Sequence, residues 1–162
     1  MGLNSIGVVG LGYVGLPTAL AFHKAGMHVT GIDISEEVIR SLESGKCHLI
    51  DDTESLEIPT ESERWRVCSD FNSIRDLDVI LITVPTPVSD EKKPDLSHVK
   101  SASKSVLGSL KKGSNSIVVL ESTVYPGVTR TILGGICDDL GLKQGVDVTL
   151  AYCPERIDPG TT

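Results

Sequence analysis

The sequence predicts an α/β fold in which helices cover both faces of a mostly parallel sheet. Short apolar runs rich in Val, Ile and Leu alternate along the chain with longer stretches of helical character. The apolar runs are continuous rather than interrupted by polar residues at every second position, which is typical of strands buried on both faces. With 162 residues, 40% of them hydrophobic, the chain is long enough for one domain with a sizeable core.

Six apolar runs are expected to form the strands of this sheet. Each is short, and most contain β-branched residues that fit a pleated, buried surface. In chain order the runs are "SIGVVG" (5–10), "HVTGIDI" (28–34), "RVCSD" (66–70), "DVILITVP" (78–85), "NSIVVLEST" (115–123) and "DVTLAYCPE" (147–155).

Four stretches between these runs are expected to be helices, because their ends carry helix start and stop signals. Pro17 is tolerated in a first turn, Ser35 is a good N-cap, and Gly26 is a natural stop. The pair Gly134–Gly135 predicts close packing in the last helix, since glycine is otherwise unfavourable there. The helices are "GLPTALAFHKAG" (15–26), "SEEVIRSLESG" (35–45), "SHVKSASKSVLGSL" (97–110) and "VTRTILGGICDDLG" (128–141).

The charge and the composition argue against several classes of partner. The chain has 15 basic and 22 acidic residues, and its net charge of −7 disfavours nucleic acid and anionic membrane surfaces. No apolar run approaches the roughly 20 residues that span a bilayer, and the N-terminus lacks the pattern of a signal peptide. The acidic stretch 46–64 is expected to form a loop or short helical pieces at the solvated surface.

The cysteines and histidines predict neither disulfides nor a metal site. The four cysteines stand at irregular spacing and form no C-x-x-C pair, which predicts a reduced, cytoplasmic protein. The histidines show no ligand spacing with the cysteines or with one another, so no metal is expected. Cys153, at the end of the last strand, is interpreted as a small packing residue.

A glycine pattern follows the first strand and opens the first helix. Gly10, Gly12 and Gly15 stand in G-x-G-x-x-G order within "GVVGLGYVGLP". In this context the first glycine permits a tight turn, the second lets the backbone approach a pyrophosphate, and the third lets the helix pack on the strand. The N–H groups at the start of the helix then face the phosphates. The pattern predicts a doubly wound, Rossmann-type sheet that binds a dinucleotide.

Asp33 stands at the end of the second strand, 18 positions after Gly15. A carboxylate there accepts hydrogen bonds from the ribose hydroxyls of NAD, and it would repel the additional phosphate of NADP. The alternative interpretation is a turn aspartate that only precedes the helix at Ser35. The glycine pattern and the spacing together favour the ribose role and predict NAD as the cofactor.

Three further strand ends carry polar, rigid sequences. They are "VPTPVSD" (84–90), "ESTVYPGV" (121–128) and "YCPERIDPG" (152–160). Singly, each has a structural explanation: a stiff turn, a helix cap and a surface ion pair. In open α/β sheets, however, ligands bind at the carboxyl ends of the strands, where the glycine pattern also lies. The three together therefore predict one functional edge.

These motifs resemble those of the UDP-glucose/GDP-mannose dehydrogenase family over nearly the whole chain. The resemblance is carried by "GLGYVGLP", "GID", "VPTPVSDEKKPDLSHV", "ESTVYPGVT" and "YCPERIDPG". The closing motif and "PDLSHV" are most similar to the branch that acts on UDP-N-acetylhexosamines, which includes the UDP-N-acetylmannosamine dehydrogenases.

The resemblance implies an enzyme that oxidises the C6 alcohol of a nucleotide sugar to a carboxylate. The family's reaction consumes two NAD+ and passes through an enzyme thioester. Residues 1–162 would form its NAD-binding domain. The family continues with central and C-terminal domains that supply the nucleophilic cysteine and most contacts to the UDP-sugar. The chain is therefore expected to be truncated and inactive alone, and the intact enzyme to be a homo-oligomer.

The resemblance also implies roles for individual residues. Thr123 and Glu155 would act in catalysis, because a hydroxyl and a carboxylate can position and activate water. Glu155 and Arg156 would bind the sugar. The residues expected to bind NAD are Gly10, Gly12, Tyr13, Val14, Gly15, Asp33, Val84, Thr86, Pro87, Ser122 and Thr123.

The chain departs from the family pattern at two positions. Many members carry Lys or Arg five positions after the ribose acid, where Val38 stands here, and whether Arg40 replaces that residue stays open. Some members have a second glutamate where Pro159 stands. Both departures concern the cofactor contacts rather than the fold.

Two other functions are compatible with part of the sequence. The N-terminal domain of a β-hydroxyacid-type dehydrogenase begins similarly, but that function leaves "YCPERIDPG" unexplained. A non-catalytic, dinucleotide-sensing module would need neither Glu155 nor the "ESTVYPG" strand end.

Overall fold

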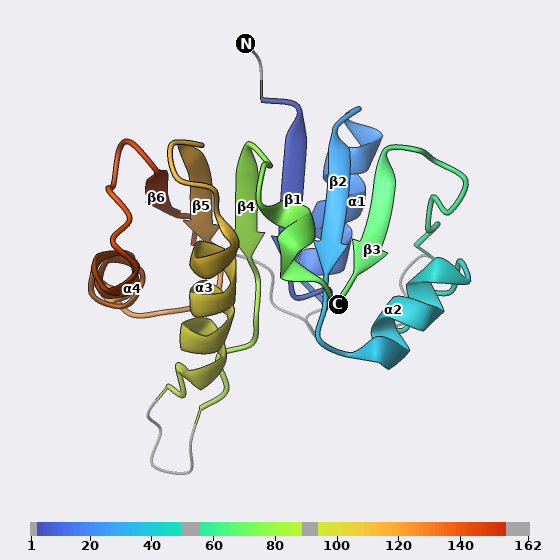
Figure 1. Cartoon of the computed structure of the whole chain (residues 1–162). Coiled ribbons are helices and arrows are strands. Elements are labelled where there is room, and N and C mark those ends of the chain that lie inside the picture. Colours follow the sequence, from blue (N-terminus) through green and yellow to red (C-terminus); the bar gives the residue numbers. More distant parts are fainter. Residues whose placement is uncertain (1–2, 50–55, 89–93, 155–162) are drawn as a thin grey trace.

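The computed structural model describes residues 3–49, 56–88 and 94–154. In these residues six strands form one sheet in the order β3-β2-β1-β4-β5-β6, and every neighbouring pair is parallel. The predicted α/β fold with a parallel sheet is confirmed (Figure 1). The strands are β1 (Ser5–Val9), β2 (His28–Ile32), β3 (Trp65–Cys68), β4 (Val79–Ile82), β5 (Ser116–Leu120) and β6 (Val148–Tyr152).

The order of the strands reverses beside β1. From β1 the chain winds outward through β2 to β3, then returns to place β4 on the other side of β1 and continues to β5 and β6. Val9 at the end of β1 pairs with Ile32 of β2 and with Ile82 of β4. Connections that leave β1 and β4 in opposite directions open a crevice at the carboxyl ends of these strands, where doubly wound sheets bind ligands.

Helices cover both faces of the sheet, as the sequence predicted. In Figure 1, α1 lies behind the sheet and α3 lies in front of it. Among the described residues no helix is both long and apolar enough to cross a membrane. The helical elements are α1 (Gly15–Lys24), α2 (Glu36–Glu43), α3 (Ser97–Ser109), α4 (Gly134–Leu140), a one-turn 3-10 helix η1 (Phe71–Ile74) and a π-helical turn η2 (Thr129–Leu133).

Two apolar cores lie on opposite faces of the sheet. Val8 belongs to the core that includes residues of α1 and α2, whereas its neighbour Val9 belongs to the core that includes residues of α3 and α4. Successive side chains of a strand point to opposite faces, so a strand between two cores must be apolar at every position. This arrangement explains the continuous apolar runs in the sequence.

Local signals set several of the element ends. Ser35 is the N-cap of α2, and its hydroxyl accepts a hydrogen bond of 3.4 Å from the Val38 N–H. Gly26 and Gly141, just after α1 and α4, have φ angles of +96° and +65°. Glycine adopts these left-handed angles without steric cost. The N-cap and the stop that were predicted at Ser35 and Gly26 are confirmed.

The last helix differs from its prediction. The stretch 128–141 begins with the π-helical turn η2 and becomes α-helical only from Gly134. The prediction of close packing at Gly134–Gly135 is wrong. Among the described residues, an added Cβ at Gly135 would meet no atom within 4 Å, and one at Gly134 would meet only Gln144 Nε2, at 3.6 Å. Nothing in the structure explains why glycines stand there.

Candidate functional site

A pocket of about 560 Å³ opens at the carboxyl ends of the central strands. Its walls include Gly10 and Gly12 after β1, Asp33 after β2 and Val84 after β4, and one face of α3 closes it. Small-molecule sites in proteins typically have volumes of about 300–1,000 Å³. The pocket lies at the carboxyl ends of the strands, as predicted, and beside the point where the strand order reverses.

The three glycines of the pattern have different surroundings. Gly10 has a φ of +95° and donates its N–H to Ile32 O at 2.8 Å, so the turn is held to β2. An added Cβ at Gly12 would meet nothing within 4 Å, which leaves the backbone open on the side of the pocket. At Gly15 an added Cβ would collide with Gly10 O and lie 2.5 Å from Thr83 Oγ1. The turn, the open backbone and the close packing are the features that a pyrophosphate-binding loop requires.

The start of α1 favours an anion. The helix begins at Gly15, directly after the exposed loop, and its first turn contains no acidic residue. Unpaired N–H groups and the helix dipole give such an end a partial positive charge. Because the first turn itself carries no carboxylate, the phosphates of a dinucleotide are suited to this position.

Asp33 lies in the pocket wall with its carboxylate fixed by two backbone groups. Oδ2 accepts a hydrogen bond of 2.8 Å from Leu11 N–H, and Oδ1 accepts one of 2.9 Å from Ser35 N–H. The second bond is the turn that was weighed as the alternative role. The first bond joins the same carboxylate to the glycine loop. An ionised carboxylate has about four acceptor positions, so it keeps capacity for ribose hydroxyls.

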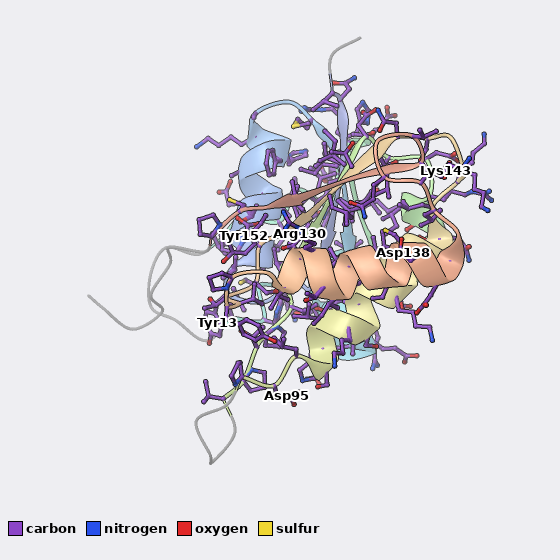
Figure 2. The ribbon with its side chains drawn as sticks, turned by 90° about the vertical axis from the view of Figure 1, so that its left-hand side faces the viewer. Tyr13, Asp95, Arg130, Asp138, Lys143 and Tyr152 are labelled. Carbon is purple, nitrogen blue, oxygen red and sulfur yellow. The ribbon has the colours of Figure 1, made fainter. Side chains whose placement is uncertain are left out.

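Most residues of the predicted cofactor set lie around this pocket. Gly15 packs behind the loop rather than in the pocket wall. Tyr13 is 44% exposed and lies toward the same end of the molecule as Asp95 (Figure 2). The predicted residues that line the pocket are Gly10, Gly12, Tyr13, Val14, Asp33 and Val84.

The other predicted residues lie elsewhere or outside the described part. Thr86 and Pro87 follow β4 and do not line the pocket. Ser122 is buried and donates its hydroxyl to Val84 O at 2.6 Å, so it ties the end of β5 to a wall of the pocket. Thr123 is exposed after β5. Glu155 and Arg156, which were expected to serve catalysis and sugar binding, lie outside the described residues.

The sequence analysis missed several residues of the pocket. On α3, His98, Ser101 and Ser105 face it at helical spacing, and Phe71 of η1 and Thr83 complete the wall. The spacing of three and four along "HVKSASKS" could have indicated one helix face, but not which partner it meets. Thr83 follows the apolar run "VILI" and could have been identified only as a strand end.

A second hollow, of about 340 Å³, lies beside the ends of β5 and β6. Tyr125, Arg130 and Tyr152 contribute to its walls, and Figure 2 shows Arg130 and Tyr152 close together. Tyr125 is 56% exposed and Tyr152 is 45% exposed. Part of the strand end 121–128 thus lies beside Tyr152 at one hollow, whereas no described residue of 84–90 lines it.

Comparison with known proteins gives a consistent result. The model of the NAD binding domain of the UDP-glucose/GDP-mannose dehydrogenase family matches residues 4–162. A UDP-N-acetyl-D-mannosamine dehydrogenase of Salmonella typhi is 36% identical over 99% of this chain and 39% of its own length. A UDP-N-acetyl-D-glucosamine 6-dehydrogenase of Pseudomonas aeruginosa is 40% identical over 96% of this chain and 36% of its own length.

A solved structure agrees with these relatives. The GDP-mannose dehydrogenase from Pseudomonas aeruginosa aligns with a TM-score of 0.87 at 28% identity, over 94% of this chain and 36% of that chain. The chain thus spans less than two fifths of the length of the relatives it matches. The glycine loop, the start of α1 and the Asp33 carboxylate fit NAD. The chain belongs to the UDP-glucose/GDP-mannose dehydrogenase family, and it corresponds to that family's NAD-binding domain.

Proposed function

We propose that this chain is the NAD-binding domain of a nucleotide-sugar 6-dehydrogenase. The substrate is a UDP-N-acetylhexosamine, and the enzyme oxidises its C6 alcohol to the uronate with two NAD+. The observation that carries the proposal is the Asp33 carboxylate, held 2.8 Å from Leu11 N–H in the wall of the pocket. The choice of sugar is supported by the UDP-N-acetylhexosamine dehydrogenases among the relatives.

Different residues of the chain contact different parts of the cofactor. Asp33 accepts hydrogen bonds from the ribose hydroxyls, and the open backbone at Gly12 lets the pyrophosphate reach the start of α1. Val84 in the pocket wall contacts the adenosine and ribose of NAD, and Thr86 and Pro87, which lie outside the wall, are assigned to the same part of NAD from the sequence. When bound, NAD+ supplies the hydride acceptor. The protein therefore has to orient the nicotinamide and exclude competing reactions.

The residues on the substrate side of the site position water and transfer protons. Ser122 and Thr123 face the nicotinamide from the end of β5, and the buried Ser122 hydroxyl holds that strand end to Val84 O. Thr123 and Glu155 position and activate the water that hydrolyses the thioester. Arg156 and Glu155 contact the sugar. The exposed position of Thr123 at the carboxyl edge supports its part of this assignment.

The remaining parts of the catalytic machinery belong to further domains of the same protein. They supply the nucleophilic cysteine and most of the contacts to the UDP-sugar, and the intact enzyme is a homo-oligomer. The lengths of the relatives support this, since the chain covers 39% or less of those compared above. A cytoplasmic location is supported by four free cysteines.

The proposal can be tested with the full-length protein. NADH formation is followed spectroscopically with NAD+ and UDP-N-acetylmannosamine, UDP-N-acetylglucosamine or UDP-glucose. We expect turnover with a UDP-N-acetylhexosamine and two NADH for each uronate, because conversion of an alcohol to an acid removes two hydrides. A full-length protein that binds NAD+ but oxidises none of these sugars would contradict the proposed substrate class.

A further inference from the structure

We propose that Thr83 is a positioning residue for the cofactor. Its hydroxyl fixes the peptide between Gly10 and Leu11, and this peptide in turn fixes the Asp33 carboxylate. The proposal rests on the NAD site of the proposed function and adds to it a residue that neither the glycine pattern nor the ribose acid includes. Three observations support it: the hydrogen bonds of Thr83, the bonds that hold both the C=O and the N–H of the Gly10–Leu11 peptide, and the narrow space beside Gly15.

Thr83 follows β4 directly and is only 8% exposed. Its backbone N–H donates to Val9 O at 2.9 Å, and its hydroxyl lies 2.7 Å from Gly10 O and 3.0 Å from Val9 O. A hydroxyl has one proton to donate. Of the two acceptors Gly10 O is the nearer, and Val9 O would keep the Thr83 backbone N–H as a donor if the hydroxyl were removed.

The Gly10–Leu11 peptide is held on both sides. A trans peptide directs its C=O and its N–H in opposite directions, and no cis peptide occurs in the described residues. The C=O of this peptide accepts from the Thr83 hydroxyl at 2.7 Å, and its N–H donates to Asp33 Oδ2 at 2.8 Å. A rotation of the peptide would weaken both bonds, so Thr83 and Asp33 are coupled through it.

The surroundings of Gly10 make this support necessary. Glycine has access to more backbone conformations than other residues, so the turn itself does not fix the orientation of the peptide. Thr83 Oγ1 would lie 2.5 Å from a Cβ at Gly15, which places the hydroxyl in the tight space between the loop and the start of α1. Without the hydroxyl, the partly buried Gly10 O would lose this donor, and an acceptor that is shielded from water and loses its donor is unfavourable.

The test uses the full-length protein with Thr83→Val, Thr83→Ala and Thr83→Ser. Calorimetry gives the Kd for NAD+ and for NADP+, and thermal unfolding gives Tm. We expect Thr83→Val and Thr83→Ala to raise the Kd for NAD+ about three- to tenfold, the effect of about one lost hydrogen bond. The preference for NAD+ over NADP+ should shrink as well, because Asp33 loses its fixed position. Thr83→Ser keeps the hydroxyl and should stay within about twofold of the parent protein.

Ser116→Ala provides the matched control. Ser116 is 2% exposed, and its hydroxyl donates to Leu77 O at 2.8 Å at the opposite end of the sheet. Its loss should lower Tm without changing either Kd. If Thr83→Val does not fold, the comparison of Thr83→Ala with Thr83→Ser decides the question.

Two results would overturn the role of Thr83 alone: unchanged cofactor preference in Thr83→Val and Thr83→Ala, or an equal loss in Thr83→Ser. A parent protein without preference for NAD+ would instead contradict the assignment of Asp33, and this proposal with it. Failure of the enzyme to oxidise UDP-sugars would affect only the proposed function, because the binding measurement does not depend on turnover.

Discussion

Gly12 and Gly15 belong to the same loop, but a methyl group would act differently at each. At Gly12 it would meet no protein atom within 4 Å, whereas at Gly15 it would collide with Gly10 O. We expect Gly12→Ala to fold normally and to weaken NAD+ binding, because its methyl group enters the space of the pyrophosphate. Gly15→Ala should lower the free energy of unfolding by about 1–3 kcal/mol, the typical cost of overpacking.

Chemical denaturation and NAD+ titration of the two variants separate these effects. Each variant serves as the control for the other, since both add one methyl group to one loop. A Gly12→Ala protein with normal NAD+ affinity would contradict the position of the pyrophosphate. A Gly15→Ala protein of unchanged stability would contradict the close contact with Gly10.

Asp33 is expected to determine the preference for NAD+ over NADP+. Asp33→Asn keeps the size of the side chain but removes its charge and one acceptor, although Leu11 N–H and Ser35 N–H both require acceptors. The Kd for NAD+ should rise about tenfold, as expected for hydrogen bonds to a charged group. The preference over NADP+ should decrease at the same time, because the repulsion of the 2′-phosphate is lost. Asp138→Asn on the exposed side of α4 is the control, and an unchanged NAD+/NADP+ ratio in Asp33→Asn would exclude the ribose role.

The catalytic role of Glu155 remains a prediction from the sequence. If it handles protons or water in the full-length enzyme, Glu155→Gln should slow turnover by about 10²–10⁴-fold. The affinity for NAD+ should change little, because Glu155 is assigned to the substrate side of the site. Steady-state kinetics and NAD+ titration measure the two quantities. Near-normal turnover would reduce Glu155 to a structural role.

At the scale of the elements, Asp78 joins β1 to β4 at the amino ends of the strands. Its Oδ2 accepts hydrogen bonds from Asn4 N–H at 3.0 Å, from Ser5 N–H at 2.9 Å and from the Ser5 hydroxyl at 2.8 Å. The bond from Asn4 N–H, followed by those from Ser5, lowers the pKa of Asp78 below its ordinary value. These bonds stabilise the ionised carboxylate, so protonation weakens the junction of the two strands.

The lowered pKa gives the stability contribution of Asp78 a definite pH dependence. The contribution is complete above the carboxyl pKa of the unfolded chain, about 3.9, and is lost as the pH falls through the lower folded value. Asp78→Asn should therefore be less stable than the parent protein at pH 7, and the difference should shrink on acidification below about pH 4. Urea unfolding across this range provides the measurement. A constant difference down to pH 2 would contradict the role of the ionised carboxylate.

The sequence predicted the elements better than it predicted their contacts. Continuous apolar runs and helix signals such as Ser35 and Gly26 are local, and they identified the six strands and most helix ends. The π-helical turn at Thr129–Leu133 has no comparable signal in the sequence. The wall that α3 contributes to the pocket depends on which helix face meets the ends of β1 and β4. That is a tertiary property.

The functional site shows the same contrast between features that local sequence signals predicted and contacts that depend on the tertiary structure. The spacing of the glycines and Asp33 predicted the loop and the acid, because the motif itself encodes their geometry. Thr83 was missed because its role depends on a hydroxyl 73 positions away in sequence from Gly10. The ribose role and the turn role of Asp33 were treated as alternatives, but the turn bond from Ser35 N–H leaves the carboxylate in the pocket wall, where it also accepts from Leu11 N–H.

At the scale of the whole molecule, we expect the chain to fold independently. One apolar core lies on each face of the sheet, and the glycine loop, Asp33 and α3 of this chain line the pocket. The proposed function, in contrast, assigns the nucleophilic cysteine and most of the sugar contacts to other parts of the enzyme. Residues 1–162 alone should therefore bind NAD+ without oxidising a nucleotide sugar.

Calorimetric titration of residues 1–162 with NAD+ tests this central assignment most directly. The protein is first shown to be folded by its circular dichroism and by a cooperative thermal transition. The assignment predicts saturable binding of one NAD+ per chain, and no NADH on later addition of a UDP-N-acetylhexosamine. A folded chain that does not bind NAD+ would contradict the assignment of the pocket, and steady NADH formation would show that the chain holds a complete active site.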